Sequence, residues 1–131
     1  MIKSVIKGYH SPDIEFEAIS PFANNDFGFL LQVFVGIDGE DGAECFNVFI
    51  CTPIWIAQNH SKQSVIIGLH TIIVQEYNHE KITKAIEELF CLECTTWDEV
   101  SNNLSYYGLS ELDYNHWTSF NNSVRCGAPD I

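Results

Sequence analysis

Five cysteines and five histidines are the residues that could supply a nucleophile, a general base or metal ligands. Cys91 and Cys94 form a C-x-x-C, but it follows an expected helix, whereas redox-active C-x-x-C motifs begin a helix whose dipole lowers the thiol pKa. No second C-x-x-C and no H-x-x-H is present to complete a zinc site. Cys51 and His70 could meet across neighbouring strands, as in a thiol hydrolase, yet a thiol buried in a strand has a raised pKa and is inert. A small thiol- or histidine-dependent enzyme is therefore the alternative, and the leading prediction is a protein that is not an enzyme.

Carboxylates gather in three short segments of the chain. Each segment alone fits a solvated loop. Together they could imitate the phosphate backbone that a basic nuclease grips, and they could pair with its Lys and Arg side chains. Aromatic residues beside the third segment would add the contact area that dominates protein interfaces. The candidate partner-binding residues are Asp13, Glu15 and Glu17; Asp38, Glu40, Asp41 and Glu44; and Glu111, Asp113, Tyr114 and Trp117.

The overall charge agrees with these clusters. The chain has 18 acidic and 6 basic residues, which gives a formal net charge of −12. Such a surface repels nucleic acid and anionic membranes, and it attracts basic proteins and speeds their encounter. Two other interpretations stay open: the charge keeps the protein soluble, or it makes an acidic decoy of nucleic acid that binds many basic proteins. The glycines near the second cluster lack the spacing of a phosphate-binding loop, and the acidic residues of that cluster lack the EF-hand pattern. We therefore expect no cofactor and no metal.

The elements that position these residues are about four mostly antiparallel strands and two or three helices. Apolar alternation and turn residues predict strands over 1–9, 27–36 and 44–52 and within 65–77, with a hairpin turn at 37–42. Strands first and helices later indicate an α+β fold with the helices packed on one face of the sheet.

Capping residues mark the starts of three helices. Thr52 followed by Pro53 predicts a short helix, and Asn78 can cap a second one. The second helix has an apolar stripe at helical spacing. Thr96-x-x-Glu99 is a capping box that opens a third helix, which Gly108 should terminate. The apolar stripe of the second helix consists of Ile82, Ala85, Ile86, Leu89 and Phe90.

Length and composition suit one domain. The chain has 131 residues and is 46% hydrophobic, so it can bury a core without disulfide or metal support. We expect a single domain over 1–131, with a core over about 1–114 and a C-terminal extension over 115–131. The N-terminal residues lack a signal-peptide pattern, and the apolar runs are too short to span a bilayer, so we expect a cytoplasmic protein.

Several short motifs, in order, resemble the immunity protein 8 family of bacterial polymorphic toxin systems, which includes some contact-dependent growth inhibition immunity proteins. They are Tyr9-His10-Ser11-Pro12-Asp13-Ile14, Phe27 to Val33, Gly36, Gly39-Glu40-x-Gly42, Phe46, Cys51-Thr52-Pro53, Trp55, His70, Ile73-Val74, Tyr77, Trp97-x-Glu99, Leu104, Gly108 and Asp113-Tyr114. The chain departs from the family pattern at Gly108-Leu109-Ser110-Glu111-Leu112, where the family has Gly-x-Trp-Glu-Phe. The resemblance implies a small α+β protein that binds a toxin domain made beside it and blocks its active site or its access to target, without a cofactor. It names no contact residue.

Overall fold

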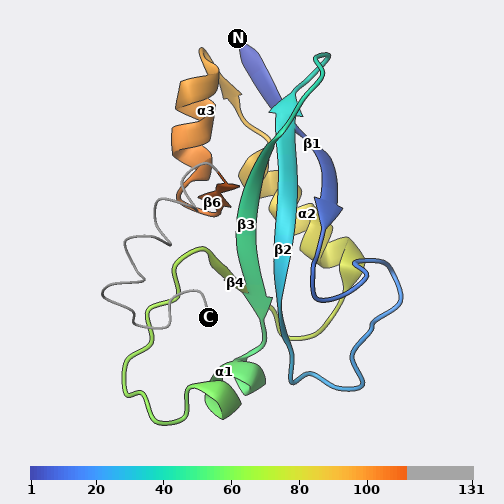
Figure 1. The fold of residues 1–131 in the computed structure, drawn as a ribbon, viewed down its shortest axis with the longest axis vertical. Helices are drawn as coiled ribbons and strands as arrows, with labels where there is room; N and C mark the ends of the chain where they lie inside the picture. Colours follow the sequence, from blue (N-terminus) through green and yellow to red (C-terminus); the bar gives the residue numbers. More distant parts are fainter. Residues whose placement is uncertain (112–131) are drawn as a thin grey trace.

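One curled, mixed sheet forms the centre of the computed structural model, which describes residues 1–111 (Figure 1). Its strands are β1 (Ile2–His10), β2 (Gly28–Ile37), β3 (Glu44–Cys51), β4 (Thr71–Ile73), β5 (Glu93–Cys94) and β6 (Leu109–Ser110). The strand order is β4-β3-β2-β1-β5, and β6 pairs with the part of β3 that β4 leaves free. The long strands β1, β2 and β3 are antiparallel neighbours, and β3 pairs with β4 in parallel.

The α+β class and the central hairpin are confirmed, whereas the expected strand set is wrong in detail. Residues 1–111 contain six strands rather than about four, because β5 and β6 are two-residue bridges that carry no periodicity of their own. The strand expected within 65–77 is limited to Thr71–Ile73. His70, directly before it, has a φ of 53°, a left-handed conformation that interrupts an extended strand.

Three helices occur in the described part of the chain, and each begins where its capping residue predicts. They are α1 (Pro53–Asn59), α2 (His79–Phe90) and α3 (Trp97–Leu104). The side chains of Thr52, Asn78 and Thr96 accept hydrogen bonds from the backbone N–H groups of the first turns. The third helix ends at Leu104, and the Gly108 N–H donates to the Leu104 carbonyl in the turn that follows.

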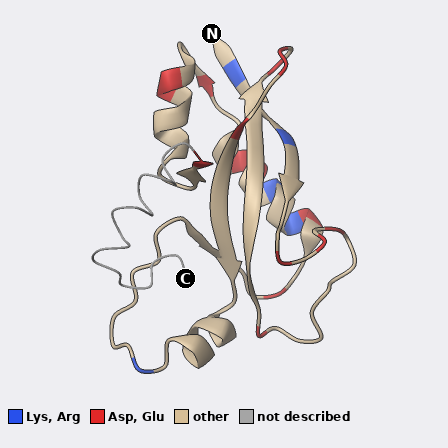
Figure 2. Cartoon of the chain, viewed as in Figure 1, with Lys and Arg blue, Asp and Glu red and all other residues tan. Residues whose placement is uncertain are grey.

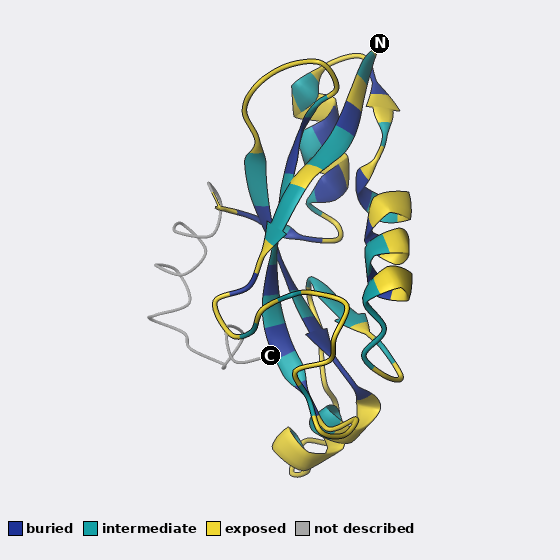
Figure 3. Ribbon diagram, turned by 90° about the vertical axis from the view of Figure 1, so that its right-hand side faces the viewer, coloured by how far each residue is buried: buried dark blue, intermediate teal, exposed yellow. Residues whose placement is uncertain are grey.

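The core lies between one face of the sheet and the helices α2 and α3. Alternate residues of β2 and β3 point into it, and they meet apolar side chains from both helices. Figure 3 shows the buried residues in the central strands and on the inner side of α2, with exposed residues on its outer side. The fully buried members include Phe29, Leu31, Val33, Val35, Phe46, Val48, Ile50, Ile86, Phe90, Val100 and Leu104.

The opposite face of the sheet is only partly covered. Leu30 and Phe34 of β2 and Phe49 of β3 are half-buried on this face. At the C-terminal end of β3, the Trp55 ring of α1 packs on Phe49 with ring centroids 5.0 Å apart. Gly28 allows this contact, because a Cβ there would lie 2.8 Å from the rings of both Trp55 and Phe49.

Candidate partner-binding surface

The turn between β2 and β3 presents three carboxylates to solvent. Asp38, Glu40 and Asp41 are all exposed there, at the far end of the hairpin (Figure 2). Gly39 and Gly42 form the turn at φ values of 84° and 95°, which favour glycine. Lys7 of β1 donates from Nζ to the Glu40 carbonyl at 2.7 Å, so it anchors the turn through the backbone. The side chains of this hairpin tip (residues 38–41) therefore remain at the surface for contacts with a partner.

Glu44, from the same expected cluster, lies at the start of β3 and turns towards α3. Its carboxylate accepts hydrogen bonds from Trp97 Nε1 at 3.0 Å, Ser101 Oγ at 3.1 Å and Ser110 Oγ at 2.5 Å. The residue is half-buried. Glu44 thus links β3 to α3 and β6. Its position in an acidic run of the sequence did not predict this structural role.

Glu111 is held from the other side of β3. Its Oε2 accepts a hydrogen bond from Asn47 Nδ2 at 2.6 Å. Burial, together with the nearby negative charge of Glu111, raises the pKa of the Cys45 thiol from 9.0 to about 11. The Cys45 thiol therefore stays protonated at neutral pH.

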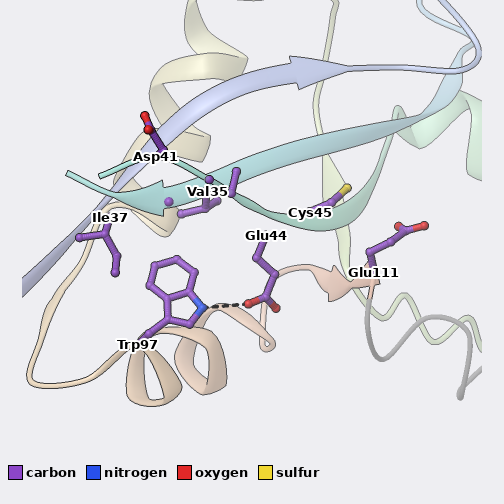
Figure 4. A pocket seen from close by; sticks show the side chains of 10 residues that line it. Val35, Ile37, Asp41, Glu44, Cys45, Trp97 and Glu111 are labelled. Atoms are coloured by element: carbon purple, nitrogen blue, oxygen red, sulfur yellow. Dashed lines mark hydrogen bonds between the residues drawn. The ribbon is translucent and has the colours of Figure 1, made fainter. Parts of the chain in front are cut away.

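A groove of about 500 Å³ runs along the hairpin between these two carboxylates (Figure 4). Ile37 of β2 and the half-buried Trp97 of α3 give it an apolar wall. Figure 4 shows Trp97 beside Ile37, its indole N–H directed at Glu44, and Glu111 beyond Cys45. Asp41 of the turn also lines the groove. Asp41, Glu44 and Glu111 therefore all line this groove, but Glu44 faces α3 while Glu111 bonds Asn47 on the opposite face of β3.

The first acidic segment, Asp13 to Glu17, lies apart from the hairpin tip, on the loop that follows β1 (Figure 2). Asp13 Oδ2 accepts a hydrogen bond from the Leu30 N–H at 2.8 Å, and Ser11 Oγ donates to the Leu30 carbonyl at 2.6 Å. These two side chains continue the pairing of β1 with β2 where the strand itself has ended. Glu15 is exposed. Glu17 is also exposed, and its backbone carbonyl accepts a hydrogen bond from Tyr77 Oη at 2.6 Å.

Three of the candidate residues fall beyond the part of the chain that is described. Asp113, Tyr114 and Trp117 lie outside residues 1–111. The candidate surface is thus built here from the hairpin tip, the groove and the 13–17 segment.

Cys51 and Cys91, the two candidate nucleophiles, both have raised thiol pKa values. Cys51 is buried, and burial raises its pKa from 9.0 to about 11. His70 directs its ring elsewhere, with Nε2 hydrogen-bonded to the Ser105 carbonyl at 2.9 Å. Burial also raises the pKa of the Cys91 thiol at the end of α2. These thiols are protonated near neutral pH, which is the opposite of what a thiol nucleophile requires.

Neither a metal centre nor a membrane-spanning helix is found in residues 1–111. That part of the chain holds no group of three or more His, Cys, Asp or Glu side chains that could bind a metal ion. Its helices are also too short or too polar to cross a membrane.

An exposed aliphatic segment is the surface feature that the sequence patterns did not predict. Val65 and Ile67 are each 74% exposed, and Leu69 is 62% exposed, in the loop between α1 and β4. A cavity of about 230 Å³ lies beneath this loop, against Trp55 and Ile73. The run Val65-Ile66-Ile67 was the available signal, but its β-branched residues indicated a strand rather than an exposed loop.

The match to known proteins agrees with the motif order. A family model described as Immunity protein 8 matches residues 4–114. Neither a curated protein nor a solved structure matches the chain. The matched range contains the hairpin, the groove and the 13–17 segment.

Proposed function

The chain belongs to the immunity protein 8 family of polymorphic toxin systems, and from that premise we propose that it binds one cognate bacterial toxin domain and neutralises it. Family membership is the observation that carries this proposal. The groove and the hairpin tip fit it: Glu44 and Glu111 in the groove are held by hydrogen bonds, and the carboxylates of the hairpin tip are exposed to a protein partner.

A basic nuclease is the toxin class that best complements this surface. The formal net charge of −12 attracts a positively charged domain and speeds its encounter with the chain. A nuclease that acts on RNA or DNA carries Lys and Arg side chains where the phosphates bind. The carboxylates Asp38, Glu40 and Asp41, on an exposed turn, can occupy such positions.

Inhibition then follows from occlusion rather than from chemistry on the toxin. A chain docked on the phosphate-binding side of a nuclease covers its active site or the path of its target. The negative charge of the bound chain also repels nucleic acid from what remains exposed. No catalytic group of the chain is needed for either effect, and we propose that it acts in the cytoplasm, where the toxin reaches its target.

Co-expression tests the proposal directly. The toxin domain encoded beside this chain is induced in cells with and without it, and survival is scored. We expect survival only with the chain present. The control is Phe46→Asp, which places a charge in the core at a residue with no exposed area and should abolish folding and protection. Equal killing in both strains, with the chain expressed and folded, would contradict the proposal.

The same assay separates the two alternatives. An acidic decoy would protect against unrelated basic nucleases, whereas an immunity protein should reject them at physiological salt. A thiol enzyme would lose its effect on replacement of Cys51 or Cys91 by Ser, whereas protection by binding should survive these changes.

A further inference from the structure

Five aliphatic side chains form an exposed apolar surface between α1 and β4. Four of them lie in the loop that joins these two elements, and the fifth, Ile73 of β4, lines the same cavity as Ile66 of the loop. Their exposed fractions range from 38% to 74%. A cluster of exposed apolar side chains on a folded domain is typical of an interface. The residues of this aliphatic surface are Val65, Ile66, Ile67, Leu69 and Ile73.

The aliphatic surface is large enough to form most of an interface. At on the order of 100 Å² each, five such side chains expose about 500 Å² of apolar area, and a stable complex buries roughly 800 Å² on each partner. The polar residues that surround the surface would then form the rim of the contact.

The segment that carries this surface is nearly free of charge, although the chain as a whole is strongly acidic. No Asp or Glu occurs between Glu44 and Glu76, and Lys62 is the single charged residue there. Figure 2 shows α1, the loop that follows it and β4 without an acidic residue, whereas acidic residues mark the hairpin tip, α2 and α3. A basic domain is therefore attracted to other parts of the molecule, because this surface offers it no carboxylate.

This distribution of charge favours a second copy of the chain as the partner. Two molecules that each carry a formal net charge of −12 repel each other over most of their surfaces. They meet with least repulsion where acidic residues are absent. Contact of the aliphatic surface with itself across a twofold axis also buries the same apolar residues on both molecules.

We propose that the chain forms a homodimer through the aliphatic surface. The hairpin tip lies at the opposite end of the central strands from α1 (Figure 1), so both tips of the dimer stay open. The dimer therefore leaves the hairpin tips free for contacts with another protein, and the inference does not depend on the proposed function.

Sedimentation equilibrium of the purified chain tests the dimer. At about 100 μM and physiological salt, we expect a mass twice that of the 14.9 kDa chain. Ile67→Asp places a carboxylate on each side of the contact, where the two charges repel, and should raise the dissociation constant of the dimer at least about tenfold.

Ile19→Asp is the matched control for this change. Ile19 is 79% exposed in the loop between β1 and β2, and Ile67 is 74% exposed, so neither substitution places a charge in the core. Ile19→Asp makes the same change in net charge away from the aliphatic surface and should change the dissociation constant of the dimer less than about threefold. Circular dichroism checks that both variants are folded.

Salt gives a second readout. Because salt screens the repulsion between two acidic chains, the dissociation constant of the dimer should fall as the ionic strength rises. Attraction between opposite charges would give the reverse dependence. A dimer that weakens in high salt would therefore contradict a contact through the aliphatic surface.

The other occupants of this surface are distinguished by the same variants. A wild-type chain that remains monomeric at this concentration contradicts the inference, as does a dimer that Ile67→Asp leaves unchanged. If the wild-type chain is monomeric and Ile67→Asp instead weakens its binding to the toxin domain, the surface contacts the toxin. The homodimer is then wrong, while the proposed function stands.

Discussion

At the scale of single residues, Asp13 holds two strands together through its carboxylate. It accepts a hydrogen bond from the Leu30 N–H at 2.8 Å, while Ser11 Oγ donates a hydrogen bond to the Leu30 carbonyl at 2.6 Å. The Ser-Pro-Asp motif thus satisfies both backbone groups of one residue at the point where β1 ends. This motif therefore has a role in the fold, whatever Asp13 contributes to partner binding.

Replacement of Asp13 by Ala should therefore destabilise the chain itself. Loss of the bond to Leu30 leaves its N–H without that acceptor and should lower the free energy of unfolding by about 1 kcal/mol. Glu15→Ala, on the same exposed segment, should change it by less than about 0.5 kcal/mol. Urea denaturation of both variants measures the difference. Equal stabilities would show that the Asp13 hydrogen bond contributes nothing to folding.

The buried thiols predict a loss of stability in alkali. Burial raises the pKa of Cys51 from 9.0 to about 11, so between these values the folded chain retains a proton that the unfolded chain has released. The contribution of the Cys51 thiol to the free energy of unfolding is complete below pH 9 and declines as the pH rises towards 11. Cys51→Ala should weaken the pH dependence of the melting temperature over this window, and an unchanged slope would contradict the assignment.

At the scale of elements, local signals predicted the helices well. Thr52, Asn78 and Thr96 were predicted to cap three helices, and all three do so, because a cap depends only on residues within one turn. The pairing of β4 with β3 in parallel was not predictable, since strand order depends on contacts distant in sequence. Nor were β5 and β6, which are too short to show alternation.

The contact between α1 and the sheet predicts a steric effect at Gly28. A methyl group there would lie 2.8 Å from the Trp55 and Phe49 rings, so Gly28→Ala should cost about 1–3 kcal/mol of stability. Gly8→Ala is the matched control on the neighbouring strand, because a Cβ there meets no atom within 4 Å. Thermal unfolding of the two variants compares them. A melting temperature for Gly28→Ala equal to that of Gly8→Ala would mean that α1 does not pack on the sheet as described.

At the scale of the whole molecule, the acidic residues were identifiable from the sequence but their grouping was not. The runs at 13–17 and 38–44 were visible, yet only the fold shows that the carboxylates of Asp13 and Glu44 also hold elements together through hydrogen bonds. Glu111 joins the groove because β6 pairs with β3 and brings it beside Asn47. A long-range contact of this kind has no periodic signal in the chain.

The net charge predicts salt-sensitive association with a basic toxin domain. Salt screens the long-range attraction, so the association rate constant should fall at least about tenfold between low and high ionic strength. Stopped-flow measurements at several salt concentrations provide the test. The dissociation rate constant should change less with salt than the association rate constant does. A salt-independent association rate would rule out electrostatic steering, although binding itself could persist.

The most direct test of the account is a titration of the toxin domain with the purified chain, in which the toxin's own activity is measured. We predict that activity falls linearly and reaches background at a fixed stoichiometric ratio, as expected for a tight inhibitory complex. Full toxin activity in the presence of a large molar excess of folded chain would contradict the account.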